Sequence, residues 1–194
     1  MWHSYRRDYR ACAADLRALL REAPAAPGPS GAVDGLCAAL GRRLGLTIHR
    51  HAASLGGNPY GLVLRGGGDC LVLYERQTSP WHQQGIILHE LGHLLYGHRG
   101  VEAGTAAALR ALVPDLPAAR LDTLRGRADG AEGHDPGDER LAEAFATVGL
   151  AWLARLPTGA HAGSAMPGPA APDDPAAARA IRRLLDDFAA GGGR

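Results

Sequence analysis

The stretch Ile86-Ile-Leu-His89-Glu90-Leu-Gly-His93-Leu-Leu95 places the pattern His-Glu-x-x-His inside an apolar run. At helical pitch, His89 and His93 lie one above the other on one face and can converge on one metal ion. Glu90 lies about 100° around the helix from His89, which suits a general base acting on a metal-bound water. Two helical histidines can also be ordinary core or surface residues. Because a buried His-Glu-His cluster without partners is costly, the stretch favours a metal-binding helix.

The signals that flank this stretch define the bounds of the helix. Ser79 is a good N-cap and Pro80 fits the first turn, so we expect a helix from Trp81 to Tyr96 that ends at Gly97. Two further histidines lie near its ends. His82 is interpreted as a surface residue, with a place in the substrate cleft as the alternative. His98 is interpreted as a residue whose positive charge interacts favourably with the dipole at the helix end.

A site with two histidines needs a third protein ligand and keeps its fourth position for water. The segment Glu139-Arg-Leu-Ala-Glu143 offers two carboxylates on one face of a helix predicted from Asp138 to Leu156. We assign Glu139 as the ligand and Glu143 as the residue that holds a histidine ring by its other nitrogen. The reverse assignment and two solvent-exposed charges are the alternatives.

The chemistry expected of such a site is hydrolysis of a peptide bond. Zinc lowers the pKa of its water towards neutrality, and Glu90 takes the proton as the water attacks the carbonyl. A stabiliser for the developing oxyanion is also expected. His134, Tyr60 and Tyr96 are the candidates, and the sequence does not choose among them.

Length and composition exclude several other classes of protein. The 194 residues fit one domain with additional terminal helices, and 21 basic residues, all arginine, balance 20 acidic ones. This balance argues against nucleic acid or an anionic membrane as the main partner. No run of about 18 uncharged apolar residues is present, so no membrane span is expected. Cys12, Cys37 and Cys70 are odd in number and far apart, which is typical of reduced thiols in a cytoplasmic protein.

The segments before the metal-binding helix predict helices followed by a small sheet. We expect, in order, a helix over 4–22, a linker over 23–31, a helix over 33–44, a strand over 46–51 and a hairpin of strands 62–64 and 70–74 around a glycine-rich turn. These strands give a mainly antiparallel sheet of about three strands. His49 and His51 share one face of the first strand, and a solvent face is the interpretation preferred over a metal site.

Further helices are predicted over 102–113, 117–127 and 175–190, with a flexible segment over 158–172. The expected organisation is an N-terminal helix and linker over 1–32, a main domain over 33–156, and a linker with a C-terminal helix over 157–194.

Two segments carry a resemblance to a known family. Ser79-Pro-Trp-His-Gln-Gln-Gly-Ile-Ile-Leu-His-Glu-Leu-Gly-His-Leu-Leu and the later Glu139-x-x-Ala142-Glu143-x-Phe145-Ala146 resemble the ImmA/IrrE family of metallo-endopeptidases over about residues 33–156. Glu143 stands where that family more usually has Asn or Asp. The resemblance implies an α+β minimal zincin-like metallopeptidase fold, in which a small sheet packs on the active-site helix. It also implies Zn²⁺ held by His89, His93 and Glu139, with Glu90 as the catalytic base.

The expected function is that of a zinc-dependent endopeptidase acting on a protein partner. The resemblance implies a helix-turn-helix repressor or an antitoxin as that partner. The alternative is a metal-stabilised, non-catalytic or toxin-like module that sequesters a regulator, and a third possibility is a small amidase. An exposed edge strand, either 62–64 or 70–74, is expected to hold an extended peptide substrate above the metal.

Overall fold

The computed structural model describes residues 2–55, 60–66, 68–98, 126–128 and 135–156. These residues form an α+β fold, which confirms the coarse α+β class expected from the sequence. The described helices are α1 (Trp2–Glu22), α2 (Gly28–Leu44), α3 (Pro80–Tyr96) and α5 (Pro136–Leu153). The described strands are β1 (Thr47–Ala53), β2 (Gly61–Gly66), β3 (Asp69–Glu75) and β4 (Gly126–Ala128).

The first two helices lie where the sequence predicts helices, but α2 begins five residues earlier than expected, at Gly28. The segment interpreted as a linker therefore ends at Pro27. Pro29 lies in the first turn of α2, where a backbone N–H has no partner inside the helix, so proline is tolerated there. Gly45 ends α2 in the left-handed conformation (φ 67°).

The four described strands form one sheet in the order β1-β3-β2-β4. β2 and β3 form the predicted antiparallel hairpin, in which Val63 pairs with Val72. β1 runs parallel to β3, with His49 opposite Leu71. Two of the three pairings are thus antiparallel, and every residue of β3 is buried in the centre of the sheet.

Strand β4 corrects two predictions. Its residues pair with β2 from Leu62↔Ala128 to Leu64↔Gly126, so residues 126 and 127 belong to a strand and not to the predicted helix 117–127. The same pairing gives β2 a neighbour on each side, and β3 lies between β1 and β2. Neither strand is the open edge that was expected to hold a peptide, because both have their backbone groups facing another strand. The helices predicted over 102–113 and 175–190, and the rest of 117–127, lie outside the described residues.

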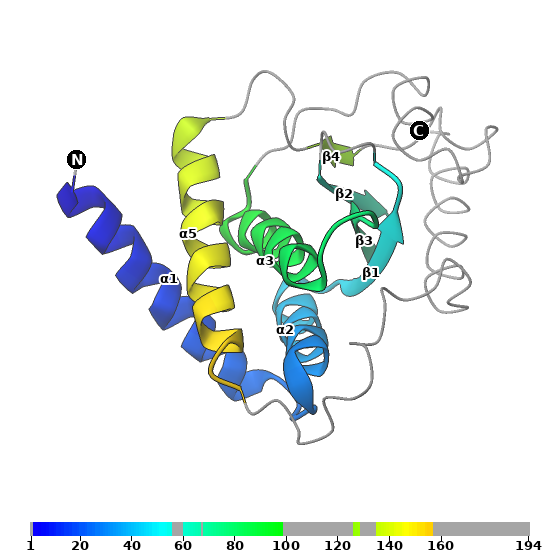
Figure 1. Ribbon diagram of the computed structural model, residues 1–194, viewed down its shortest axis with the longest axis horizontal. Coiled ribbons are helices and arrows are strands. Elements are labelled where there is room, and N and C mark those ends of the chain that lie inside the picture. Colours follow the sequence, from blue (N-terminus) through cyan, green and yellow to red (C-terminus); the bar gives the residue numbers. More distant parts are fainter. Residues whose placement is uncertain (1, 56–59, 67, 99–125, 129–134, 157–194) are drawn as a thin grey trace.

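Helix α3 lies between the sheet and α5, and α1 packs against the far side of α5 (Figure 1). α1 contributes Cys12, Leu16 and Leu19 to the same core cluster that holds Ile87 and Leu91 of α3. The N-terminal helix is therefore packed into the core that supports α3. None of the described helices is long and apolar enough to cross a membrane.

Candidate metal centre

Helix α3 presents the His-Glu-x-x-His stretch from a position fixed at both ends. At its start, the Ser79 hydroxyl accepts a hydrogen bond from the His82 backbone N–H over 3.2 Å, as the sequence predicts for an N-cap. At its end, Gly97 adopts the left-handed conformation (φ 65°). Between these ends Glu90 and His93 are buried, with exposed fractions of 0% and 1%.

Helix α5 brings the third candidate ligand to α3 because small residues let the two backbones approach closely. A Cβ atom on Gly92 would lie 3.1 Å from the Cα atom of Ala142, and one on Gly149 would lie 2.9 Å from both methyl groups of Leu88. Asp135 caps the start of α5 by accepting a hydrogen bond from the Gly137 N–H over 2.7 Å. The two helices therefore run antiparallel, and the start of α5 lies beside the last turns of α3.

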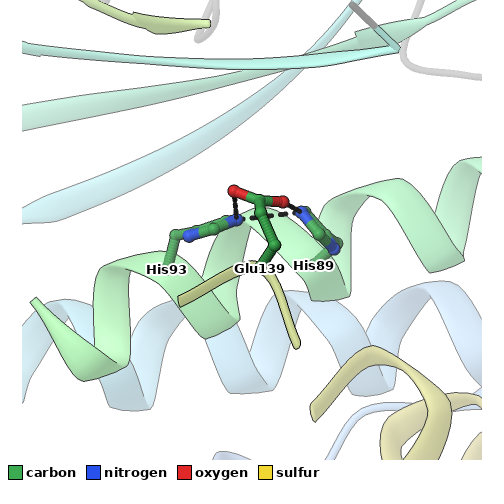
Figure 2. Close-up of side chains that lie close together, drawn as sticks. All are labelled: His89, His93 and Glu139. Atoms are coloured by element: carbon green, nitrogen blue, oxygen red, sulfur yellow. Dashed lines mark hydrogen bonds and ion pairs between the residues drawn. The ribbon is translucent and has the colours of Figure 1, made fainter. Parts of the chain in front are cut away.

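Three side chains meet at this contact (Figure 2). The two carboxylate oxygens of Glu139 lie 3.4 Å from Nε2 of His89 and 3.4 Å from Nε2 of His93. The two Nε2 atoms lie 2.9 Å apart. Ligand atoms about 2.1 Å from a tetrahedral zinc ion lie roughly 3.4 Å from one another. The two oxygen–nitrogen spacings match this value, and the two nitrogens lie closer together. Two imidazole nitrogens and one carboxylate oxygen form a group that could hold a metal ion.

The cluster is buried on one side and accessible on the other. His93 is fully buried, whereas the side chains of His89 and Glu139 are 19% and 33% exposed. A water or a substrate group can therefore approach from the side of His89 and Glu139. This asymmetry is the arrangement that a site with three protein ligands and one open position requires.

Glu90 occupies the space between α3 and the first residue of β2. A Cβ atom on Gly61 would collide with the Glu90 carboxylate and lie 2.9 Å from Cγ2 of Ile86. The lack of a side chain at position 61 is therefore what makes room for the Glu90 carboxylate. This role of Gly61 has no local signal in the sequence, because the glycine lies 29 positions before Glu90 in the chain.

Glu143, one helical turn after Glu139, faces the other ring nitrogen of His89. Its Oε2 lies 3.6 Å from Nδ1 of His89, and its side chain is 72% exposed. The structure thus places Glu139 beside both Nε2 atoms and Glu143 behind one imidazole.

The structure also places a residue at the site that sequence reasoning missed. Nδ1 of His98 lies 2.9 Å from Nδ1 of His93, and Nε2 of His98 lies 3.4 Å from Oδ1 of Asp138. The sequence interpretation gave His98 only a role at the helix end. The signal was present in Gly97, because a left-handed residue after a helix folds the next residue back over the last turn.

The candidate oxyanion stabilisers fall in different places. The Tyr96 hydroxyl lies 3.1 Å from Oδ2 of Asp15 and 3.3 Å from Sγ of Cys12, so it is directed towards α1. Burial raises the pKa of Tyr96, and its contacts with Cys12 and Asp15 raise it further. Tyr60 is half-exposed and its ring lies 5.3 Å from that of His82. His134 lies outside the described residues.

The other histidines considered from the sequence are not part of the described metal cluster. His82 is exposed, and its Nδ1 lies 2.7 Å from the Thr78 hydroxyl. Nε2 of His49 lies 3.1 Å from Oδ1 of the buried Asp69. His51 is buried in β1, so the expectation of a solvent face for this strand was wrong at His51. Helix α2 lies against the other face of β1, where Arg50 contacts Ser30 and Ile48 lies beside Gly41.

Comparison of the chain with protein-family models, with curated proteins and with solved structures gave no match.

Proposed function

We propose that this protein is a zinc-dependent endopeptidase that hydrolyses a peptide bond in a protein partner. The observation that carries the proposal is the meeting of His89, His93 and Glu139, with Glu90 next to His89 in the chain. A site that only stabilises a fold is normally closed by four protein ligands, whereas three ligands leave a position for water or substrate. A glutamate beside such a position is the arrangement that hydrolysis needs.

Zinc suits these donors because imidazole nitrogen and carboxylate oxygen are among its usual ligands, and both spacings between Glu139 and the histidines match those of a tetrahedral zinc site. When bound, the ion would polarise the scissile carbonyl and lower the pKa of a water towards 7. His89 and His93 must present neutral Nε2 lone pairs to hold it. The contact of Glu143 with Nδ1 of His89 favours that tautomer, because a proton on Nδ1 leaves Nε2 free to bind.

Glu90 is the residue proposed to move the proton. Its carboxylate would take a proton from water as the water oxygen attacks the carbonyl carbon. The same proton would pass to the leaving nitrogen as the carbon–nitrogen bond breaks, so Glu90 returns to its starting state. The close contact of Glu90 with the backbone of β2 at Gly61 restricts the positions open to the carboxylate. Such restriction supports a base of fixed orientation.

The complete burial of Glu90 favours a second candidate function, a metal-stabilised module that sequesters a regulator without cutting it. A base must reach the reacting water, and a carboxylate that stays covered by β2 cannot do so. The two functions differ in their dependence on Glu90. Replacement of Glu90 by Gln keeps the three metal ligands and removes the base.

The proposed partner is a regulatory protein, either a helix-turn-helix repressor or an antitoxin, and the proposed compartment is the cytoplasm. The resemblance of the His-Glu-x-x-His and Glu139 segments to the ImmA/IrrE family supports the choice of partner. The three buried free thiols, Cys12, Cys37 and Cys70, support a reducing compartment.

Incubation of the zinc-loaded chain with the regulator encoded next to its gene, followed by mass spectrometry of the products, tests the proposal. The native chain should produce discrete fragments, and the E90Q variant should bind the same regulator and produce none. Stable binding by both forms without any Glu90-dependent fragment would favour the sequestering module.

A further inference from the structure

We propose that His98 and Asp138 form a positioning relay that holds His93 in the tautomer and orientation needed to bind the metal. The inference rests on the proposed metal site and adds two residues to it. The relay runs from Nδ1 of His93 to Nδ1 of His98 over 2.9 Å, and from Nε2 of His98 to the Asp138 carboxylate over 3.4 Å.

His98 is held behind His93 by the chain itself. Its backbone N–H donates to the carbonyl of His93 over 3.1 Å, and the N–H of Gly97 donates to the carbonyl of Leu94 over 3.3 Å. These two bonds are the Schellman pattern of a helix that ends in a left-handed glycine. Backbone and side chain of His98 therefore both contact His93. The His98 side chain is only 6% exposed, so water competes little for these contacts.

The proton positions along the relay follow from the metal site. Nε2 of His93 faces the cluster and must carry no proton if it is to bind a cation. The proton of a neutral His93 then lies on Nδ1, which donates to Nδ1 of His98. His98 in turn carries its proton on Nε2, which donates to the Asp138 carboxylate. Each contact thus joins one donor to one acceptor.

The opposite arrangement disfavours metal binding. If His93 carried its proton on Nε2, that proton would point into the space between His89 and Glu139 where a metal would sit. Nδ1 of His93 would then have to accept from His98, whose Nε2 would face the Asp138 carboxylate without a proton to donate. An unprotonated nitrogen facing a carboxylate is unfavourable, so, when both imidazoles are neutral, Asp138 selects the tautomer that binds metal.

The first turn of α5 acts on His93 from both sides. Glu139 lies 3.4 Å from its Nε2, and the adjacent Asp138 reaches its Nδ1 side through His98. Arg140, the next residue, contacts Oδ2 of Asp8 in α1 over 3.0 Å. Three consecutive residues therefore tie the start of α5 to the metal cluster, to the relay and to the N-terminal helix.

Zinc affinity, measured by competition with a chelator, tests the relay without reference to cleavage. Loss of an outer hydrogen-bonding partner typically weakens metal binding about 10–100-fold. We expect that loss in H98L and in D138A. The variant H98N, which keeps an acceptor near the position of Nδ1, should recover part of it. H82L is the matched control, since it makes the same change on α3 away from the cluster, and its affinity should equal that of the native chain.

The visible spectrum of the Co²⁺-substituted protein supplies a second measurement that a general loss of stability would not mimic. H98L and D138A should shift its bands because the His93 ring is no longer fixed, whereas H82L should leave them unchanged. If H98L does not fold, D138A still tests the relay, because the Asp138 side chain is partly exposed and its replacement should disturb folding less.

Native affinity and an unchanged spectrum in D138A or H98L would overturn the relay. Failure of the native chain to bind zinc would overturn both the relay and the proposed function. If every variant binds zinc with native affinity and cleavage still depends on Glu90, the relay is wrong and the proposed function stands.

Discussion

A Cβ atom on Gly92 of α3 would lie 3.1 Å from the Cα atom of Ala142 in α5. The two helices are therefore in near backbone contact. Gly92 directly precedes the candidate ligand His93, and Ala142 lies three residues after Glu139. The distance between the helices at this pair of residues sets how far the Glu139 carboxylate reaches across to the histidines.

The variant G92A should force the helices apart and weaken both folding and metal binding. G85A is its matched control, because a Cβ atom there would meet only the flexible end of Leu150 at 3.3 Å. Both changes gain the same helix propensity, so that gain cancels in the comparison. We expect G92A to be at least about 1 kcal/mol less stable than G85A in denaturant unfolding, and to bind zinc less tightly. Equal stability and equal zinc affinity would show that α5 can shift at no cost.

The variant G61A should lose hydrolysis while it keeps the metal. A methyl group at position 61 would collide with the Glu90 carboxylate, and it would not reach the three ligands through any described contact. Displacement of a base by about 1 Å can lower the rate roughly 100-fold. Metal content and cleavage rate, measured on the same preparation, check this prediction. A native cleavage rate would mean that Glu90 does not need its present position.

The variant E139A should weaken zinc binding more than E143A. Glu139 lies beside both Nε2 atoms, whereas Glu143 is largely exposed and, within the described residues, contacts Nδ1 of His89 alone. Loss of a residue that contacts the outer nitrogen of a metal-binding histidine, as Glu143 does, typically lowers metal affinity about 10–100-fold, and loss of a ligand should lower it more. Chelator competition on the two variants decides the order. The reverse order would exchange the roles of the two glutamates.

The stability of the protein should fall as the pH rises above about 9. Burial raises the pKa of the Cys37 thiol to about 12, from an ordinary value near 9. The unfolded chain therefore releases this proton at a lower pH than the folded chain, and each pH unit in between lowers the free energy of unfolding by up to about 1.4 kcal/mol. Below the unfolded pKa this contribution is constant.

The variant C37A removes this titration, so its free energy of unfolding should fall less steeply between about pH 9 and pH 11. Cys70, whose pKa burial also raises to about 12, remains in both proteins. Denaturant unfolding at several pH values gives the two slopes. Identical slopes would mean that Cys37 ionises equally in the folded and unfolded chains.

The features that local chemistry controls could be predicted from the sequence. Ser79 and Gly97 carry the cap chemistry of α3, so both of its ends were predictable to within one residue. The hairpin of β2 and β3 was predictable because a glycine-rich turn separates two apolar runs. The spacing of His89 and His93 required only helical pitch.

The features that depend on distant contacts could not be predicted in the same way. The three residues of β4 carry no alternating pattern, and their partners on β2 lie more than 60 positions earlier. His98 lies beyond the end of α3, where helical periodicity no longer relates it to His93, and the left-handed turn at Gly97 was its one local signal. The role of Gly61 is visible only once β2 is seen to pass over Glu90.

The zinc content of the native chain, purified without added metal, tests the central claim most directly. Because His89, His93 and Glu139 converge on one point, we expect about one zinc ion per chain. The E90Q variant should contain the same amount, since it keeps all three ligands, and H93A should contain little. A native content near zero that titration with zinc cannot raise would contradict the claim.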